Sequence, residues 1–414
     1  MRALRTPELR TDPDTADVES WAALPWRARR PSISTPFMRF CSLSSVKNRI
    51  VLGQPLPFSV RDSERMLLLA RGQTIADNEQ LLALFQRGAL VDISELTEAI
   101  KPTRQESQTE RLARLPAEWD RGMQDVRKAL SAPPEKLVEA LDGATELMIS
   151  LIHCSPNMAL AHIVRQPTSG TGHYGINHSM HAATACHAAA RYLGWSDDDQ
   201  RRAFQAALTM NLGMLDLQAR LSSQVSPLTP MQREVINEHP IRSVEMLEAA
   251  GIMDADWLDA VLHHHEVPDG SGYPHGLTDV GELATMLRYA DIYTARLSSR
   301  ASRPAMSAQQ AGRELHQMGA QSPLAAALIK AFGIFPPGSL VRLASGEVGL
   351  VIRNGDKAHR PMVSVLTNAA GEPRQMPVTR DSSRDEHAVV ALLPAHAAPI
   401  RLSDERVAAL ITGV

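Results

Sequence analysis

The chain has 414 residues, of which 44% are hydrophobic and 21% are charged, as is ordinary for a globular protein. Its formal net charge of −3 gives no sign of a general nucleic-acid or membrane-surface binder. No run of about 18 apolar residues exists, so we expect no membrane span. The three cysteines, Cys41, Cys154 and Cys186, are widely spaced without a CxxC motif, which favours a reducing cytoplasm over a disulfide framework.

The first part of the chain predicts a leader followed by a small domain. Residues 1–47 are rich in Pro, Arg and Ser and lack hydrophobic periodicity, which indicates a mostly disordered leader without a secretory signal. Residues 49–100 predict a small α/β domain, with short strands on either side of a helix between Thr74 and Gly88. Gly88 stands where a glycine commonly ends a helix.

The central part of the chain is helical by its periodicity. Residues 101–165 begin as a polar linker or solvated helix and continue as lead-in helices with apolar residues at helical spacing. Residues 166–332 contain successive helical segments separated by Gly or Pro. An all-helical domain of roughly 160 residues follows from this pattern.

The C-terminal part predicts β-structure. Residues 335–395 alternate in hydrophobicity around two turns, Ser345-Gly346 and Ala370-Gly371, which is typical of two hairpins in a small β-barrel-like domain or a meander. Residues 396–414 are left as a C-terminal tail. The expected fold is therefore mainly α, a helical bundle flanked by an α/β domain and a β domain.

Histidines and one aspartate are distributed over several helices of the central domain. Such side chains can converge on a divalent metal inside a bundle, although a single helical histidine is usually just hydrogen-bonded or exposed. The candidate metal ligands are His178, His239, His264, His265 and Asp291. The stretch HHEVPDGSGYP adds an acidic residue and a glycine-rich turn directly after two of these histidines.

This stretch resembles the signature of the HD-GYP family of bacterial cyclic-di-GMP phosphodiesterases. The similarity extends over residues 174 to about 304: YGINHSM contains His178, LTPMQREVINEHP contains His239, and RYADIYTARLSSRASRP contains Asp291. The family members' small N-terminal domain and C-terminal barrel also have counterparts here. The resemblance implies an HD-type bundle that binds two or three metal ions and hydrolyses a cyclic dinucleotide.

The chain departs from the family at the histidine–aspartate dyad, whose carboxylate bridges the metals. The matching stretch here is ALTMNLGMLDL, with Gly213 keeping the register, so Met210 replaces the histidine and Asn211 the aspartate. Met214 replaces a lysine that would neutralise substrate phosphate. Two cations without a bridging anion repel by several kcal/mol, and a thioether is a poor ligand for Fe, Mn or Mg. We therefore expect one divalent metal (Fe, Mn or Mg) at most and no complete two-metal centre.

The loop after the histidines keeps the family pattern. In the family this loop shapes the rim of the site and a surface for partner proteins. The loop residues that the resemblance implicates in ligand or partner binding are Glu266, Asp269, Gly270, Gly272, Tyr273 and Pro274. Its implied partners are a cyclic dinucleotide and a diguanylate cyclase (GGDEF protein) or another signalling protein.

Three functional interpretations remain open at this point. The first is a cytoplasmic regulator that binds a partner or a cyclic dinucleotide with little or no hydrolysis. The second is an active metal-dependent cyclic-di-GMP phosphodiesterase with an unusual metal site. The third is a helical scaffold whose flanking domains carry the function, although neither flank contains a catalytic constellation.

Overall fold

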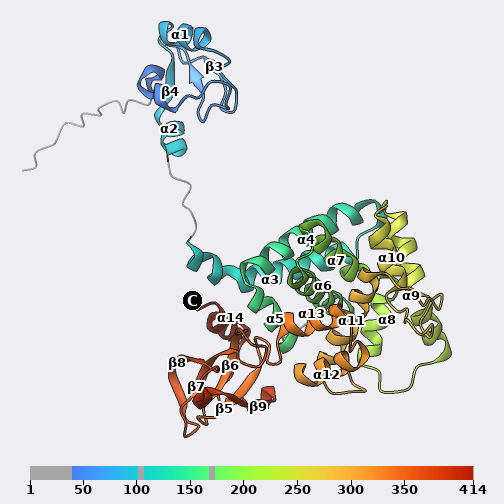
Figure 1. Cartoon of the computed structure of the whole chain (residues 1–414). Helices are drawn as coiled ribbons and strands as arrows, with labels where there is room; N and C mark the ends of the chain where they lie inside the picture. Colours follow the sequence, from blue (N-terminus) through green and yellow to red (C-terminus); the bar gives the residue numbers. More distant parts are fainter. Residues whose placement is uncertain (1–39, 101–106, 167–172, 414) are drawn as a thin grey trace, which may run out of the picture. The chain divides into compact units, whose positions relative to one another are not determined.

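The computed structural model describes residues 40–100, 107–166 and 173–413. The chain divides into two compact units, Met1–Gln105 and Glu106–Val414 (Figure 1). Residues 1–39 of the expected disordered leader, residues 101–106 of the expected linker and residues 167–172 lie outside the described part.

The N-terminal unit is a small antiparallel sheet with helices around it. The strands β1 (Phe40–Ser42), β2 (Val60–Arg61), β3 (Leu67–Leu69) and β4 (Leu90–Asp92) pair in the order β1-β4-β2-β3. The helical segments are η1 (Leu43–Arg49), α1 (Asn78–Gln86) and α2 (Ile93–Ile100). The Asp77 side chain caps α1 by accepting a hydrogen bond from the Gln80 amide at 2.8 Å.

The sequence-based expectation for this unit differs from the structure in two places. Residues 40–47, assigned to the disordered leader, form β1 and most of η1, because Leu43 and Val46 are buried in the small core. The apolar run 49–59 contains almost no strand, since its backbone forms turns before β2 begins at Val60. The pattern of apolar residues therefore predicted a sheet in this unit but missed its edge strand β1.

The larger unit is a helical bundle followed by a sheet. Its helices are α3 (Gln108–Leu130), α4 (Pro134–Cys154), α5 (Pro156–Arg165), α6 (Tyr174–Leu193), α7 (Asp197–Thr209), η2 (Leu212–Met214), α8 (Leu215–Ser222), α9 (Pro230–Ala249), α10 (Ala255–His263), α11 (Glu282–Leu297), α12 (Ala308–Met318) and α13 (Pro323–Phe332). The mainly helical fold expected for this region is confirmed.

Helix α6 lies at the centre of this bundle. It packs against α7, α8, α11 and α13, and its alanines at positions 182, 183, 185, 189 and 190 are fully buried. Small side chains let neighbouring helix axes approach closely. Helix α3, whose sequence is polar enough to suggest a linker, buries Leu115 and Trp119 in the same core. The lead-in helices are therefore part of one packed body.

The C-terminal strands form an open antiparallel sheet. They are β5 (Leu340–Leu343), β6 (Val348–Arg353), β7 (Met362–Thr367), β8 (Pro373–Asp381) and β9 (Val389–Leu393), in the order β8-β7-β6-β5-β9. Both predicted hairpins, β5–β6 and β7–β8, are confirmed. The predicted barrel is wrong, because β8 and β9 stand at opposite edges and do not pair. Alternation identifies strands, whereas closure depends on pairing between the first and last strand.

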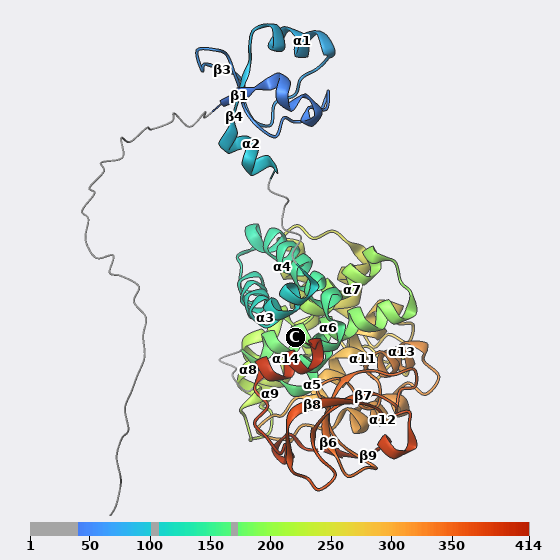
Figure 2. The same cartoon turned by 90° about the vertical axis from the view of Figure 1, so that its left-hand side faces the viewer.

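The chain after the sheet returns to the helices. After the short turns η3 (Asp385–His387) and η4 (Ala395–Ala397), helix α14 (Asp404–Thr412) packs against α3 and α5 (Figure 2). Among the described helices, no single one is long and apolar enough to cross a membrane. Only α4 and α5 together pass that test, as a pair bent by 104°. All three cysteines are free thiols.

Candidate metal centre

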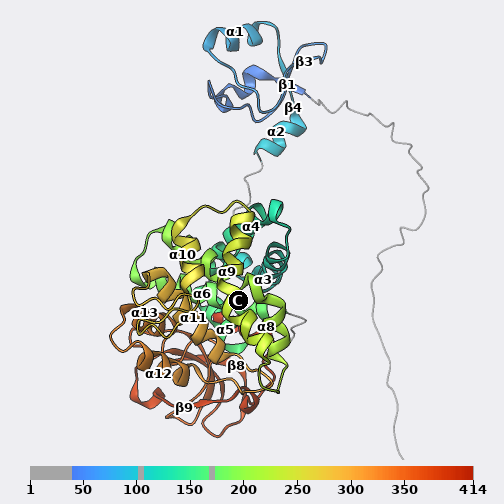
Figure 3. The same ribbon diagram turned by 90° about the vertical axis from the view of Figure 1, so that its right-hand side faces the viewer.

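His239 and His264 bring two ring nitrogens together in the bundle interior. His239 lies within α9 and His264 directly follows α10, and these two helices pack against each other (Figure 3). Both side chains are fully buried. The Nδ1 atom of His239 donates to the Ile236 carbonyl at 2.5 Å, and Nδ1 of His264 donates to the Val261 carbonyl at 2.7 Å. The two Nε2 atoms face each other at 3.2 Å.

This arrangement fixes the tautomer of both rings. A carbonyl only accepts, so Nδ1 carries the proton in each ring and Nε2 presents a lone pair when the ring is neutral. Burial, and then the charge of neighbouring His264, lowers the pKa of His239 to about 3. Burial likewise lowers the pKa of His264. Two facing lone pairs repel each other unless a cation lies between them, and an Nδ1–carbonyl bond is the usual support of a metal-binding histidine.

His265 completes a group of three imidazoles. The ligand atoms of His239, His264 and His265 all lie within 4.8 Å of one another and could hold a metal ion. The Nε2 atom of His265 is buried and has no hydrogen-bond partner among the described residues. Burial, followed by the charge of His264, holds the pKa of His265 well below its usual range. The cluster therefore offers neutral nitrogen donors, which suit Zn, Cu, Fe or Ni.

Tyr273 covers one side of this cluster. Its ring stacks on His265 with 4.5 Å between centroids and 20° between planes, and it lies 6.4 Å from the His239 ring. Burial raises the pKa of Tyr273, with a further contribution from Asp291, so the phenol stays neutral. Tyr273, which the resemblance assigned to a partner surface, is half-buried and faces the histidines.

The other two predicted ligands form a pair of their own. Nε2 of His178, in α6, donates to Oδ1 of Asp291, in α11, at 2.7 Å. Burial opposes ionisation of Asp291, but the His178 hydrogen bond and the nearby His265 and His264 hold the pKa of this carboxyl well below its usual range. Asp291 is thus the anionic group next to the three-histidine cluster. The structure brings all five predicted ligands into one region, as three converging histidines and one His–Asp pair.

Asn211 lies beside this region with its amide unsatisfied. It is fully buried, and neither Oδ1 nor Nδ2 has a hydrogen-bond partner among the described residues. Ser243, one helical turn after His239, donates to the Met210 carbonyl at 2.9 Å and accepts from the Gly213 amide at 3.0 Å. These two bonds flank Asn211 and hold it against the helix that carries His239.

Gly213 makes this close approach possible. A Cβ atom at this position would stand 2.8 Å from the His239 carbonyl oxygen. Met210 is fully buried in the core, as expected for an apolar residue filling the space of a ligand. An unpartnered buried amide normally requires a water or an ion, so the surroundings of Asn211 fit a bound metal with its water.

The glycine-rich loop is held from within by Glu266. This buried carboxylate accepts hydrogen bonds from the amides of His275 at 2.7 Å, Gly276 at 3.1 Å and Leu277 at 2.9 Å. A Cβ atom on Gly272 would stand 2.5 Å from the backbone of Glu266 and Val267, so only glycine fits there. Gly270 has φ +76°, which also favours glycine.

The remaining loop residues point away from the histidines or lie at the rim. Asp269 is exposed and accepts from the Ser271 amide and hydroxyl at 2.9 and 2.6 Å. Pro274 follows the cluster-facing Tyr273 and is half-buried. The loop thus has an internal anchor, a cluster-facing tyrosine and an exposed edge.

Two further contacts near the site involve Tyr174. Tyr174 stacks on His178 with 6.0 Å between ring centroids, and Nε of Arg300 donates to the Tyr174 hydroxyl at 2.9 Å. Tyr174 stands one turn before His178 in α6, so helical spacing predicts their proximity. Nothing in the sequence indicates that Arg300 reaches back to the start of α6.

Comparisons with known proteins agree with this architecture. The HD domain family model matches residues 153–324. The chain is 31% identical over 274 residues to the cyclic di-GMP phosphodiesterase PA4108 of Pseudomonas aeruginosa, covering 64% of this chain and 65% of that protein. It is 33% identical over 117 residues to the cyclic di-GMP phosphodiesterase response regulator RpfG of Xanthomonas campestris, covering 27% of this chain and 30% of that protein.

One further sequence relative and one solved structure are also similar to this chain. A 3′3′-cGAMP-specific phosphodiesterase of Vibrio cholerae is 24% identical over 155 residues, covering 36% of this chain and 35% of that protein. Bd1817, a HDG"Y"P protein from Bdellovibrio bacteriovorus, superposes with a TM-score of 0.43 at 16% identity, covering 70% of this chain and 97% of that chain. The chain spans just under two thirds of the Pseudomonas relative and about a third of the Xanthomonas and Vibrio relatives. The chain thus matches the HD domain model over residues 153–324 and is related in sequence to cyclic di-GMP phosphodiesterases.

Proposed function

We propose that this protein is a bacterial cyclic-di-GMP signalling regulator that binds one divalent metal and a cyclic dinucleotide and hydrolyses the dinucleotide slowly or not at all. The buried, neutral Asn211 is the observation that carries this proposal. It stands where the family resemblance implies a bridging carboxylate, beside the histidine cluster.

The charge balance at Asn211 supports a single ion. Two unit charges about 4 Å apart repel by roughly 4 kcal/mol at an effective dielectric constant of 20, and two dications repel by about four times as much. A bridging carboxylate offsets part of this repulsion, whereas the amide of Asn211 has no net charge. Among the described residues, the carboxylate beside the cluster is Asp291, and it is already bonded to His178.

The chain's own residues suit a one-ion site. His239, His264 and His265 would hold the ion, and the backbone carbonyls bonded to two of these rings would keep their Nε2 atoms oriented. Tyr273 would limit solvent access from its side. Bound there, a divalent cation would supply Lewis acidity and attract a phosphodiester oxygen.

Binding rather than turnover is also the proposed role of the loop. Glu266 holds it in one shape, and its exposed edge contains Asp269, Ser271 and His275. We propose that this edge contacts a diguanylate cyclase or another signalling protein in the cytoplasm. The relatives' names describe hydrolysis of cyclic dinucleotides, which supports a cyclic dinucleotide as the ligand here.

A second candidate is an active phosphodiesterase with an unusual metal site. The presence of all five predicted ligands in one region favours it, as does the 31% identity to a phosphodiesterase. The two candidates differ in turnover, not in fold.

A binding and hydrolysis assay on the full chain distinguishes them. Protein loaded with Mn or Fe is titrated with cyclic di-GMP by calorimetry, and linear product is followed by chromatography. The proposal expects binding without product above the metal-free background. Turnover that disappears in the His265→Ala variant would instead establish the active phosphodiesterase.

A further inference from the structure

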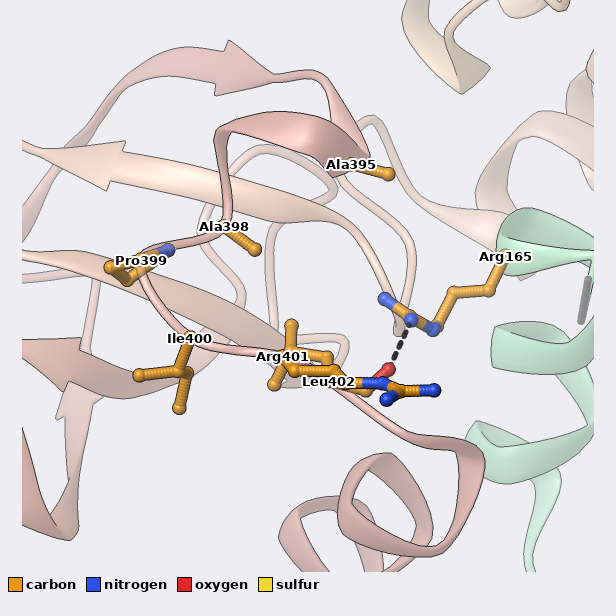
Figure 4. A pocket seen from close by; sticks show the side chains of 7 residues that line it. All are labelled: Arg165, Ala395, Ala398, Pro399, Ile400, Arg401 and Leu402. Atoms are coloured by element: carbon orange, nitrogen blue, oxygen red, sulfur yellow. Dashed lines mark hydrogen bonds between the residues drawn. The ribbon is translucent and has the colours of Figure 1, made fainter.

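A second cavity lies far along the chain from the histidines, where α5 meets the segment that links β9 to α14. It has a volume of about 360 Å³ and is lined by Arg165, Ala395, Ala398, Pro399, Ile400, Arg401 and Leu402 (Figure 4). Arg165 is the last residue of α5, and the other six belong to the linking segment. None of these residues takes part in the metal centre described above.

Arg165 is fixed at one side of this cavity. Its Nη2 atom donates to the Leu402 carbonyl at 3.1 Å, and its Nε–H is buried without a hydrogen-bond partner among the described residues. Its aliphatic stem is close enough to Gly338 that a Cβ there would stand 3.2 Å from Cγ. A guanidinium has five N–H donors in a fixed plane, so this group retains unused donors while its position is set.

Arg401 supplies a second positive charge to the same cavity. It is exposed and has no hydrogen bond or ion pair within the part of the chain that the structure describes. Arg165 and Arg401 both line this cavity, and Figure 4 shows the hydrogen bond from Arg165 to the carbonyl of Leu402, the residue next to Arg401. Burial lowers the pKa of Arg165, and the nearby carboxylate of Asp404 opposes that change.

The other side chains that line the cavity are apolar. Ala398, Pro399 and Ile400 form a continuous stretch beside the two arginines. A volume of about 360 Å³ lies within the range of small-molecule sites and is much larger than a bare phosphate ion requires. The combination of two guanidinium groups and an apolar wall fits a ligand with an anionic end and a flat apolar body.

We propose that this cavity binds a phosphorylated small molecule of nucleotide size, with its phosphate on Arg165 and Arg401 and its base against Pro399 and Ile400. This site is independent of the metal centre and of the proposed function. A ligand bound there would contact both the end of α5 and the segment that leads into α14.

Calorimetric titration of the full chain with guanosine 5′-monophosphate tests this site, with inorganic phosphate and unphosphorylated guanosine as separate arms. We expect the monophosphate to bind more tightly than either. Because each arginine supplies a charged phosphate contact, Arg165→Gln and Arg401→Gln should each weaken binding at least about tenfold. Arg342→Gln, an exposed arginine on β5 with the same change in charge, should leave the affinity unaltered.

Three results would overturn the proposal. They are no binding of the monophosphate at millimolar concentration, equal affinity in wild type and Arg401→Gln, and inorganic phosphate binding as tightly as the monophosphate. Arg401 is exposed, so its variant is expected to fold even if Arg165→Gln does not. Metal chelation should not change the result, which separates this site from the histidine cluster.

Discussion

His239 and His264 show how two side chains 25 residues apart are prepared for a common ion. Each ring uses its Nδ1–H on a carbonyl three residues earlier, which leaves both Nε2 lone pairs facing each other at 3.2 Å. Repulsion between those lone pairs makes the apo cluster less favourable, and a cation relieves it. At the residue scale, the geometry of the cluster therefore favours metal binding.

The His264→Ala variant tests the metal centre at this scale. Loss of a residue that only hydrogen-bonds to a metal ligand typically lowers metal affinity roughly 10- to 100-fold. Removing one of the three imidazoles that bind the ion directly should lower the affinity by more than this. Competition against a chromophoric chelator measures the change. His263→Ala is a matched control, since His263 bonds to Asp259 and lies outside the cluster. Equal loss of affinity in both variants would contradict the assignment.

Gly272 has no space for a side chain. A methyl group there would stand 2.5 Å from backbone atoms of Glu266 and Val267, so Gly272→Ala must displace the loop. We expect a loss of roughly 1–3 kcal/mol in unfolding free energy, together with weaker metal binding because Tyr273 moves off His265. Urea unfolding measures the first effect. The control is Gly143→Ala in α4, where a Cβ has open space.

Elements differ in how far their sequence determines them. Helices with capped ends and apolar stripes can be predicted from the local spacing of residues. The family resemblance of one short motif also predicted that His264 and His265 converge with His239. The open edges of the C-terminal sheet could not be predicted, because strand alternation carries no information on whether β8 meets β9. The inward stacking of Tyr273 and the anchoring role of Glu266 also depend on loop geometry that the motif letters do not contain.

Glu347 links the strands of the C-terminal sheet and makes its stability depend on pH. This buried residue, just before β6, accepts hydrogen bonds from Arg380 and Arg374, both on β8. The hydrogen bond from Arg380 lowers the pKa of Glu347 from 4.5 to about 2. Burial opposes this change, and hydrogen bonds from Ser345 and Arg374 add to it. Because the folded pKa lies below the unfolded one, the stabilisation is complete above about pH 4.5 and is lost as pH falls towards 2.

The Glu347→Gln variant should therefore be less stable than wild type by roughly 1–3 kcal/mol at neutral pH. The difference should shrink as pH falls from about 4.5 towards 2. Chemical unfolding at several pH values, followed by circular dichroism, measures it. Glu372→Gln, an exposed glutamate before β8, should change stability by less than about 0.5 kcal/mol. A pH-independent difference for Glu347→Gln would contradict this account.

The two units have separate cores. The N-terminal unit buries Phe58, Ile75 and Val91, and the larger unit has one core through its helices from Leu115 to Ala408 and a smaller one on its C-terminal sheet. Deletion of residues 1–105 should therefore leave the thermal midpoint of the helical unit within about 2 °C of its value in the full chain. Calorimetry measures the midpoint, and a shift of 10 °C or more would show that the two units stabilise each other.

We propose that the helical unit holds one metal ion, at the cluster of His239, His264 and His265. The uncharged, buried Asn211 stands where the family resemblance implies a bridging carboxylate, and the buried Met210 stands where it implies a histidine. The double variant Met210→His, Asn211→Asp introduces both of these ligands and should allow a second ion to bind.

Metal content per chain, measured by mass spectrometry after reconstitution with Mn, Fe or Zn and removal of loosely bound ions, distinguishes a one-ion site from a two-ion site. We expect one ion per chain in the wild type and two in the double variant. Two tightly held ions per wild-type chain would contradict it.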